Sequence, residues 1–303
     1  MVDTVRVEYF GKWRGGTPAG WTRIESQRSA QAMDGKAVVK AGRMMVNEET
    51  GLRIGGDTEY ATWFEVSLPR LLFGNNGIVI RTQEQIDEAV RKAMGLAEAV
   101  SEPMLQGTNP RCTRLDLVAQ FLIEPSDMML AHRETAHPRV RGRKSYYVGE
   151  SLHFVGKERR CRIYDKVKEM QGKPGHVTRV EWQLRGDALR HDMRRDFVAL
   201  RNLNIEDCYD AFRRLCMEFE PKALPALSDF CDLLAAGIRD GLMVGGIPFF
   251  DAWARGKHPK TVRRVRGEIA KRRAEVFKVE WQKLLPDDFG AMLAVDYHCP
   301  APF

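Results

Sequence analysis

The sequence predicts an α+β fold, in which a strand-rich part extends to about residue 200 and a helical part follows it. In the first part, short stretches of alternating apolar and polar residues are separated by glycine-rich turns, which is typical of β-strands. From about Asp187 onward, the apolar residues recur at helical spacing. We therefore divide the 303-residue chain into a strand-rich domain, residues 1–200, and a helical domain, residues 201–303.

The first elements follow from local pattern and turn chemistry. Strands are predicted at 4–10 and 21–29, with a turn-rich loop between them. The stretch 61–77 begins as an alternating strand, breaks at a proline and closes with an Asn-Gly turn. An amphipathic helix is predicted over 82–100, with Thr82 as its N-cap.

The middle of the chain continues the strand pattern. We predict a strand at 112–123, a basic loop at 132–144 and a hairpin at 145–156. Two further strands are predicted at 160–166 and 178–185, where apolar and polar residues alternate.

Composition narrows the class of protein. The formal net charge of +7 favours an acidic partner such as nucleic acid. The six cysteines form no C-x-x-C pair, which predicts buried free thiols in a reducing cytosol. The N-terminus lacks the apolar core of a signal peptide and no apolar run has transmembrane length, so we expect a soluble protein without a membrane partner.

Three of the predicted strands, at 112–123, 160–166 and 178–185, combine into one unusual surface. Every second residue of a strand lies on the same face. If these strands are neighbours, one polar face carries two carboxylates, one tyrosine and several cations. Its members are Arg114, Asp116, Gln120, Arg160, Arg162, Tyr164, Lys166, Arg179, Glu181, Gln183 and Arg185.

That set of side chains has a chemical use. Two carboxylates can hold Mg²⁺ or Mn²⁺, which polarises a phosphodiester, and the cations neutralise charge that develops on the phosphate. A phenol has a pKa of about 10 and needs a nearby lysine and metal to ionise and attack. The alternative stays open, because antiparallel sheets often have a solvated face on which opposite charges pair across strands.

The chain resembles replication initiators of the rolling-circle class through the ordered motifs TRLDL, YYVG, RIYDK and RVEWQLRG. The resemblance is to the group that replaces the His-hydrophobe-His metal motif with carboxylates, and the chain contains no H-x-H triplet. WFEVSLPRLLFGNN (63–76) and KTVRRVRGEI (260–269) are similar to segments of filamentous-phage gene II/X-type replication proteins.

The resemblance implies an HUH- or RRM-like nicking core with a central antiparallel sheet, flanking helices and a divalent metal, Mg²⁺ or Mn²⁺. It assigns Tyr164 as the nucleophile that becomes linked to a 5′ phosphate, and Asp116 and Glu181 as metal ligands. Lys166 is assigned to stabilise the phosphate or the tyrosinate.

One departure from the family pattern leaves the number of metal ligands open. Gln120 lies where family members often carry a second acidic residue. Glu65 is a candidate for a further ligand, and an ordinary strand glutamate is an equally good interpretation of it.

As a whole, the resemblance implies a metal-dependent DNA-nicking endonuclease and strand transferase. Such a protein initiates replication by nicking and rejoining one strand at a rolling-circle origin in the host cytoplasm, with host helicase and polymerase as partners. The alternative is a non-catalytic module that binds single strands or regulates, because RRM-like sheets also do this.

Two basic segments, 132–144 and 255–273, are predicted to hold DNA through its phosphates. Trp13, Trp21 and Trp63 are candidates for stacking on unpaired bases, although core packing is the favoured role of Trp63. The arginines predicted to contact DNA are Arg114, Arg139, Arg141, Arg143, Arg160, Arg162, Arg179, Arg263, Arg264 and Arg266.

Other tyrosines compete with Tyr164 as nucleophile. Tyr146 and Tyr147 are adjacent and are assigned to packing in the hairpin. Tyr209 follows an H-x-x-R pattern at 191–194, which is similar to tyrosine recombinases. Recombinase catalytic domains are mainly helical, so the strand-rich pattern of this chain disfavours Tyr209.

Overall fold

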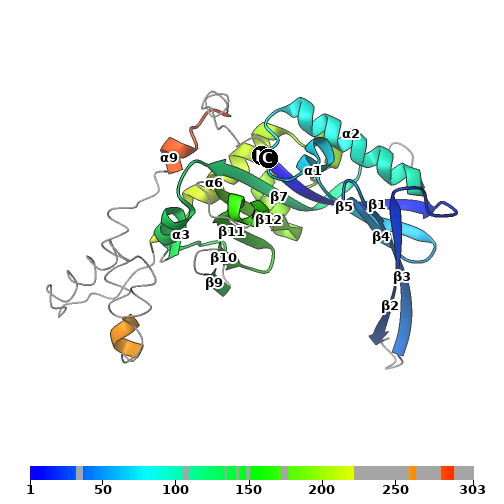
Figure 1. Ribbon diagram of the computed structural model, residues 1–303, viewed down its shortest axis with the longest axis horizontal. Coiled ribbons are helices and arrows are strands. Elements are labelled where there is room, and N and C mark those ends of the chain that lie inside the picture. The colour runs from blue at the N-terminus through cyan, green and yellow to red at the C-terminus, as the bar shows by residue number, and fades with distance from the viewer. Residues whose placement is uncertain are drawn as a thin grey trace.

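The fold is built on one large antiparallel β-sheet with helices packed against it (Figure 1). The computed structural model describes residues 1–31, 37–104, 109–133, 135–140, 143–147, 151–171, 177–221, 259–263 and 281–289. Within these residues the sheet has 11 strands in the order β2-β3-β4-β5-β1-β7-β12-β11-β10-β9, with β6 paired to β1. The α+β class and the central antiparallel sheet are therefore confirmed.

The strands of the main sheet are all antiparallel to their neighbours. The β2–β3 hairpin extends away from the body of the molecule (Figure 1). The strands are β1 (Val2–Trp13), β2 (Trp21–Gln31), β3 (Ala37–Asn47), β4 (Arg53–Gly56), β5 (Tyr60–Ser67), β6 (Ser101–Pro103), β7 (Arg111–Phe121), β9 (Arg143–Tyr147), β10 (Ser151–Val155), β11 (Arg159–Asp165) and β12 (Thr178–Arg185).

The helices are shorter elements between and after the strands. A small second sheet pairs β8 (Thr135–Ala136) with β13 (Glu220–Pro221). The helices are α1 (Leu68–Phe73), α2 (Gln83–Val100), α3 (Pro125–Arg133), α4 (Lys166–Gln171), α5 (Gly186–Met193), the 3-10 helix η1 (Leu200–Asn202), α6 (Ile205–Met217) and α9 (Trp281–Leu284).

The helix predicted over 82–100 is confirmed together with its cap. Thr82 accepts a hydrogen bond from the backbone of Gln85, and the Gln85 side chain accepts one from the backbone of Thr82. This capping box satisfies amide groups that the first turn leaves without helical partners. One side of α2, which includes Ile86, Ala89 and Ala93, is buried in the core.

Alternation along the central strands separates a buried face from a polar one. On β12, Val180, Trp182 and Leu184 are completely buried, whereas Glu181 and Gln183 between them are half-buried. Helices α3, α5 and α6 contact the central strands, and their apolar residues join the core. We call the opposite face, which carries Glu181, the open face.

Helix α6 lies beyond the predicted boundary at residue 200, yet it belongs to the same core as the sheet. It contacts β7, and Cys208, Phe212 and Leu215 of α6 are buried in that core. Within the described residues, packing does not break at residue 200, because the sheet needs this helix to cover its apolar face. Most of the region predicted to form a second domain lies outside the described residues.

Some local features differ from the sequence-based expectations and others agree with them. Lys166 is the first residue of α4 and not the last residue of its strand, since β11 ends at Asp165. The cysteines at 112, 161, 208 and 216 are buried free thiols, as predicted, and those at 231 and 299 lie outside the described residues. Within the described part of the chain, no helix combines the length and apolarity needed to cross a membrane.

The structure contradicts the stacking role predicted for Trp13 and Trp21 and the core position favoured for Trp63. Trp13 and Trp21 are buried, so they cannot stack on bases. Trp63 is not in the core but half-buried on the open face, with the Arg6 guanidinium 4.0 Å above its ring. The ring also lies over Gly55, because a Cβ added there would lie 2.2 Å from Trp63 Cζ2.

We expect Gly55→Ala to destabilise the protein by about 1–3 kcal/mol, because the methyl group overlaps the Trp63 ring. Gly95→Ala is the matched control: Gly95 is exposed within α2 with no atom near its added Cβ, so alanine should stabilise by roughly 0.5–1 kcal/mol. Urea unfolding of both variants measures the difference. Equal stability of the two variants would show that Trp63 does not lie over Gly55.

Candidate functional site

Strand register brings the predicted nucleophile and the two predicted metal ligands onto the open face. In an antiparallel pair, residues directly opposite each other lie on the same face. The cross-strand rows over β11, β12 and β7 are Tyr164 with Arg179 and Gln120, Arg162 with Glu181 and Val118, and Arg160 with Gln183 and Asp116. Asp116, Glu181 and Tyr164 thus share one face of a single sheet, as predicted.

Tyr164 is buried and its hydroxyl points at a carboxylate. The hydroxyl donates a hydrogen bond to Glu181 Oε2 at 3.3 Å, and only 3% of the residue is exposed. The Arg162 guanidinium lies 4.1 Å from the centre of the tyrosine ring. Burial raises the pKa of Tyr164 well above its usual value, although the positive charge of Arg179 opposes that shift. The phenol is therefore neutral in this state.

Asp116 is a buried carboxylate paired with an arginine. Arg114 donates to both of its oxygens, with a distance of 2.9 Å from Nε to Oδ1, and only 2% of Asp116 is exposed. Burial raises its pKa to about 7, because desolvation outweighs the attraction of Arg114. A group in this condition gains much from an additional positive charge nearby.

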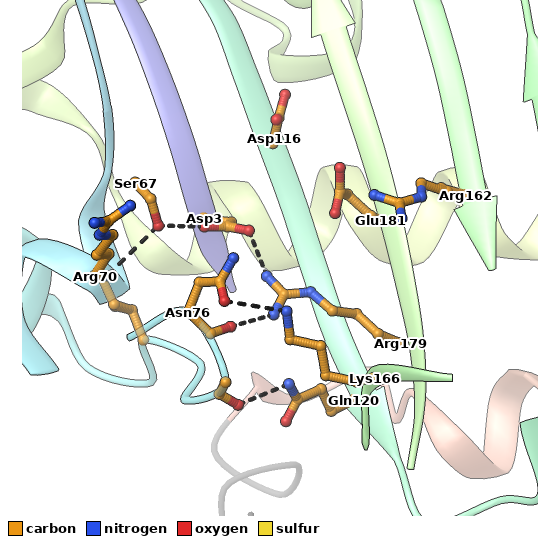
Figure 2. A network of polar contacts seen from close by, with 12 residues as sticks. Asp3, Ser67, Arg70, Asn76, Asp116, Gln120, Arg162, Lys166, Arg179 and Glu181 are labelled. Atoms are coloured by element: carbon orange, nitrogen blue, oxygen red, sulfur yellow. Dashed lines mark hydrogen bonds and ion pairs between the residues drawn. The ribbon is translucent and has the colours of Figure 1, made fainter. Parts of the chain in front are cut away.

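The two carboxylates are diagonal neighbours across β7 and β12. Asp116 lies opposite Gln183, two residues beyond Glu181, and diagonal pairs of this kind are about 7–8 Å apart. Figure 2 shows Asp116, Glu181 and Arg162 on the same side of their three strands. Among the described residues, no group of three or more histidine, cysteine, aspartate or glutamate side chains is arranged to hold a metal.

Gln183 supplies an oxygen that the sequence analysis did not assign to the site. Its Nε2 donates to Asp116 Oδ2 at 3.5 Å, and its Oε1 is buried without a hydrogen-bond partner. A buried oxygen without a partner is costly, and a bound cation would satisfy it. The alternation already placed Gln183 on the polar face, but no pattern distinguished it from a solvated residue.

A buried arginine, Arg179, holds neighbouring segments of the site in place through hydrogen bonds. Arg179 is completely buried, directly opposite Tyr164, and donates to Asp3 Oδ2 at 2.5 Å and to the Asn76 carbonyl at 2.6 Å (Figure 2). The Asp3 carboxylate also accepts a hydrogen bond from Ser67 at 2.7 Å. The prediction that Arg179 contacts DNA is therefore corrected, because its guanidinium is enclosed by protein.

The loop after α1 explains the motif at 63–76. Ser67 caps α1, and Gly74 ends it in the left-handed conformation, with a φ of 76° that favours glycine. This turn directs Asn76 to the ends of β11 and β12, where its Oδ1 accepts from Lys166 Nζ at 3.2 Å. The next residue, Gly77, accepts from Gln120 at 2.9 Å. In this structure the motif holds other site residues in place.

Lys166 lies at the edge of the site, next to Tyr164. Its Nζ is 5.9 Å from the centre of the Tyr164 ring and donates to Glu169 Oε2 at 2.6 Å. Burial, and then the charge of Arg179, lowers its pKa. Glu169 also accepts a hydrogen bond from Arg162 at 3.2 Å. One carboxylate is therefore bonded to both cations beside the tyrosine.

The remaining predicted DNA contacts fall into different groups. Arg160 is exposed on the open face, whereas Arg114 bridges Asp116 and Glu65, with a distance of 3.4 Å to the Glu65 carboxylate. Arg139 pairs with Asp192 at 2.9 Å and with Glu218. Arg139 is thus committed to an internal ion network, and its predicted contact with DNA is not supported.

Part of the predicted DNA surface lies outside the described residues. This applies to the side chains at 141, 143, 264 and 266 and to most of the two basic segments. Arg263 is described, and it is exposed in a helical stretch at 259–263.

The competing tyrosines differ in what the structure says of them. Tyr209 is completely buried and its hydroxyl donates to the Pro286 carbonyl at 2.6 Å, so it has a structural role. The pattern at 191–194 belongs to the end of α5, where His191 contacts Asp192. The side chains of Tyr146 and Tyr147 lie outside the described residues.

Comparison with known proteins found a weak structural likeness and no matching family. No protein-family model matches the chain, and no curated protein matches it. Among solved structures, the chain is similar to a rolling circle replication initiator protein from Geobacillus stearothermophilus, with a TM-score of 0.37 and 11% identity over 76% of this chain and 88% of that chain. A likeness at this level carries no argument about function.

The raised pKa of Asp116 leads to a test of its charge. The Asp116 carboxyl binds its proton more tightly in the folded state than in the unfolded state. Protonated Asp116 therefore contributes stability that is complete below about pH 4 and is lost as pH rises through about 7. We expect the melting temperature of Asp116→Asn, relative to the unmodified protein, to increase from pH 5 to pH 8. Thermal unfolding by circular dichroism measures this difference.

Asp187→Asn is the control for this experiment. Asp187 is exposed, and its hydrogen bond from Arg190 lowers its pKa. The difference in melting temperature between Asp187→Asn and the unmodified protein should therefore stay constant from pH 5 to pH 8. A flat difference for Asp116→Asn as well would mean that Arg114 keeps Asp116 charged despite burial.

Proposed function

We propose that this protein is a rolling-circle replication initiator of the filamentous-phage gene II/X type, which nicks and rejoins one DNA strand through Tyr164. The observation that carries the proposal is the hydrogen bond from the Tyr164 hydroxyl to Glu181, on the same face of the sheet as Asp116. A tyrosine hydroxyl, the carboxylate that accepts its hydrogen bond and a second carboxylate thereby lie on one surface that also carries arginines. This grouping supports phosphoryl transfer to tyrosine.

The proposed reaction is an exchange of one phosphodiester for another. Tyr164 Oη forms a bond to phosphorus, and the bond from phosphorus to the 3′ oxygen of the preceding nucleotide breaks. The phenol loses its proton, and the 3′ oxygen takes up a proton to leave as a 3′-hydroxyl. The products are a 5′-phosphotyrosine and a 3′ end that a polymerase can extend. The reverse attack by a 3′-hydroxyl rejoins a strand.

The surrounding residues have separate parts in this reaction. Glu181 Oε2 already accepts the hydroxyl hydrogen bond and is the nearest described group that can take the proton. Arg179, directly opposite, favours the phenolate by its charge. Arg162 and Lys166 are available for the phosphate once they are released from Glu169.

The donor set also fits the divalent cation that the family resemblance implies. Asp116 and Glu181 offer carboxylate oxygens, and Gln183 Oε1 is a buried oxygen without a partner beside them. Hard cations such as Mg²⁺ prefer oxygen ligands, with one or two carboxylates and the rest from water and phosphate. When bound, such a cation supplies charge neutralisation at the phosphate.

A second function is favoured by one observation. Tyr164 is 3% exposed, and its pKa is raised well above the usual value, first of all by burial. A tyrosine that stayed covered in the DNA complex would have only a packing role. The open face would then bind single-stranded nucleic acid without cleaving it.

The decisive variant is Tyr164→Phe, which removes the attacking oxygen and keeps the ring under Arg162. We expect nicking of origin single strands in the presence of Mn²⁺ to fall below detection, with binding retained within about threefold. Glu181→Gln should slow nicking by about 10²–10⁴-fold, the usual contribution of a positioned proton acceptor. Denaturing gels that separate the covalent adduct from free DNA give the measurement.

Tyr209→Phe serves as the matched control, because Tyr209 is also a buried tyrosine with a hydrogen-bonded hydroxyl. It should lose stability and keep nicking activity. Mass spectrometry of the adduct should place the nucleotide on the peptide containing Tyr164. An adduct on another tyrosine, or no adduct on a verified origin, would contradict the proposal.

A further inference from the structure

A row of arginines crosses the open face next to the site. Register places Arg6 of β1 opposite Arg114 of β7, and Arg114 opposite Arg185 of β12. Arg160 of β11 lies beside this row, opposite Gln183. Like charges directly opposite each other destabilise a sheet. We call these four residues the arginine row.

Carboxylates within the described residues neutralise only half of the row. Arg114 is held by Asp116 and by Glu65 at 3.4 Å, and Glu65 also lies 3.8 Å from Arg6. No described carboxylate pairs with Arg160 or Arg185. That end of the row therefore has no direct ion pair among the described residues, and Asp116 and Glu65 act on Arg185 only as weaker, opposing charges.

Among the four arginines, Arg185 most clearly lacks a hydrogen-bond partner for its guanidinium in the described part of the chain. It is half-buried, and its Nε is buried without a hydrogen-bond partner. Burial lowers the pKa of its guanidinium, and the charges of Arg114 and Arg160 lower it further. Exposed arginines would be screened by water and salt, but a partly buried cation is screened much less. The fold therefore tolerates repulsion here that a neutral residue would remove.

We propose that the arginine row binds a backbone phosphate of the single strand that enters the site, at a position away from the phosphate that reacts. A guanidinium presents paired N–H donors that match phosphate oxygens, and Arg160 is exposed while Arg185 is half-buried, neither of them in an ion pair with a described carboxylate. Arg185 is four residues from Glu181 along β12, which corresponds to about 13 Å. This phosphate is thus a neighbour in the strand and not the one that Tyr164 attacks.

This inference rests on the proposed function, which identifies the bound strand as single-stranded DNA. It also predicts an effect on binding affinity that does not depend on cleavage. The phosphate should strengthen association and fix the register of the strand over Tyr164. Arg185 is accordingly a positioning residue, because it does not touch the reacting atoms.

The first experiment measures binding of a fluorescent single-stranded oligonucleotide by anisotropy at several salt concentrations. Tyr164→Phe is used as the background, so that no cleavage occurs. We expect Arg185→Gln to weaken binding about tenfold and to make the slope of log affinity against log salt shallower by about 0.7, the value for one lost contact to a single strand. Its melting temperature should be unchanged or higher, because repulsion is relieved.

Arg190→Gln is the matched control, since Arg190 is an exposed arginine on the adjoining helix α5 that pairs with Asp187. It should leave affinity and slope unchanged. If Arg185→Gln lowers the melting temperature and binds like the control, Arg185 has a structural role and the inference is overturned.

The second experiment replaces single phosphates of the oligonucleotide with neutral methylphosphonates. One linkage, displaced from the cleaved one, should weaken binding to the background protein about tenfold and have no effect on Arg185→Gln. Equal effects of every linkage on both proteins would overturn the inference. Inorganic phosphate in millimolar excess should not compete, because the row holds a phosphate within a strand; effective competition would show a site for free phosphate instead.

The outcomes for the two proposals can be told apart. If the protein nicks DNA and Arg185→Gln binds and nicks like the control, this inference fails and the proposed function stands. If no nicking is found but Arg185→Gln loses binding and salt dependence, the phosphate site stands and the function of a non-cleaving binder is favoured.

Discussion

The arrangement of the site depends on the buried ion pair between Arg179 and Asp3. It joins the first residues of β1 to the first residues of β12, strands separated by β7, and the same guanidinium holds the loop at Asn76. Removing one partner of such a pair typically costs 3–5 kcal/mol, because the other charge stays buried. Tyr164, Lys166 and Gln120 all adjoin this pair or the loop that it holds. The ion pair therefore fixes the positions of the residues around Tyr164 on the open face.

The open face is electrostatically strained in a way that suits a charged ligand. Asp116 is buried with a pKa of about 7, whereas the partly buried Arg185 faces other arginines. The first would gain from an added cation and the second from an added anion. A phosphodiester with a divalent cation supplies both charges within one ligand. Residues optimised for stability alone would not be placed this way, and such strain is common at functional sites.

Two cations beside Tyr164 are held by one carboxylate. Arg162 covers the ring, and Glu169 engages both Arg162 and Lys166. A phosphate brings stronger negative charge than a carboxylate and accepts the same donors. In the proposed reaction, a phosphate that replaced Glu169 would take over the donors of both cations. Burial is the main cause of the raised pKa of Tyr164, so the phenol is neutral in this arrangement.

The sequence by itself determined the α+β class, the helix capped by Thr82 and the side of its own strand on which each of Asp116, Glu181 and Tyr164 lies, because alternation and caps are local properties of the chain. The strand order β7-β12-β11, which joins these sides into one face, was decided by the tertiary structure. It did not determine the roles of Asp3 and Asn76, since no local pattern pairs them with a residue more than a hundred positions away. Burial was also decided only in three dimensions. Arg179 and Arg160 have the same pattern in their strands, yet neighbouring segments enclose Arg179 and leave Arg160 in solvent. The register that aligns Arg6, Arg114 and Arg185 depends on bulges in β1 and on strand order, which tertiary packing alone sets.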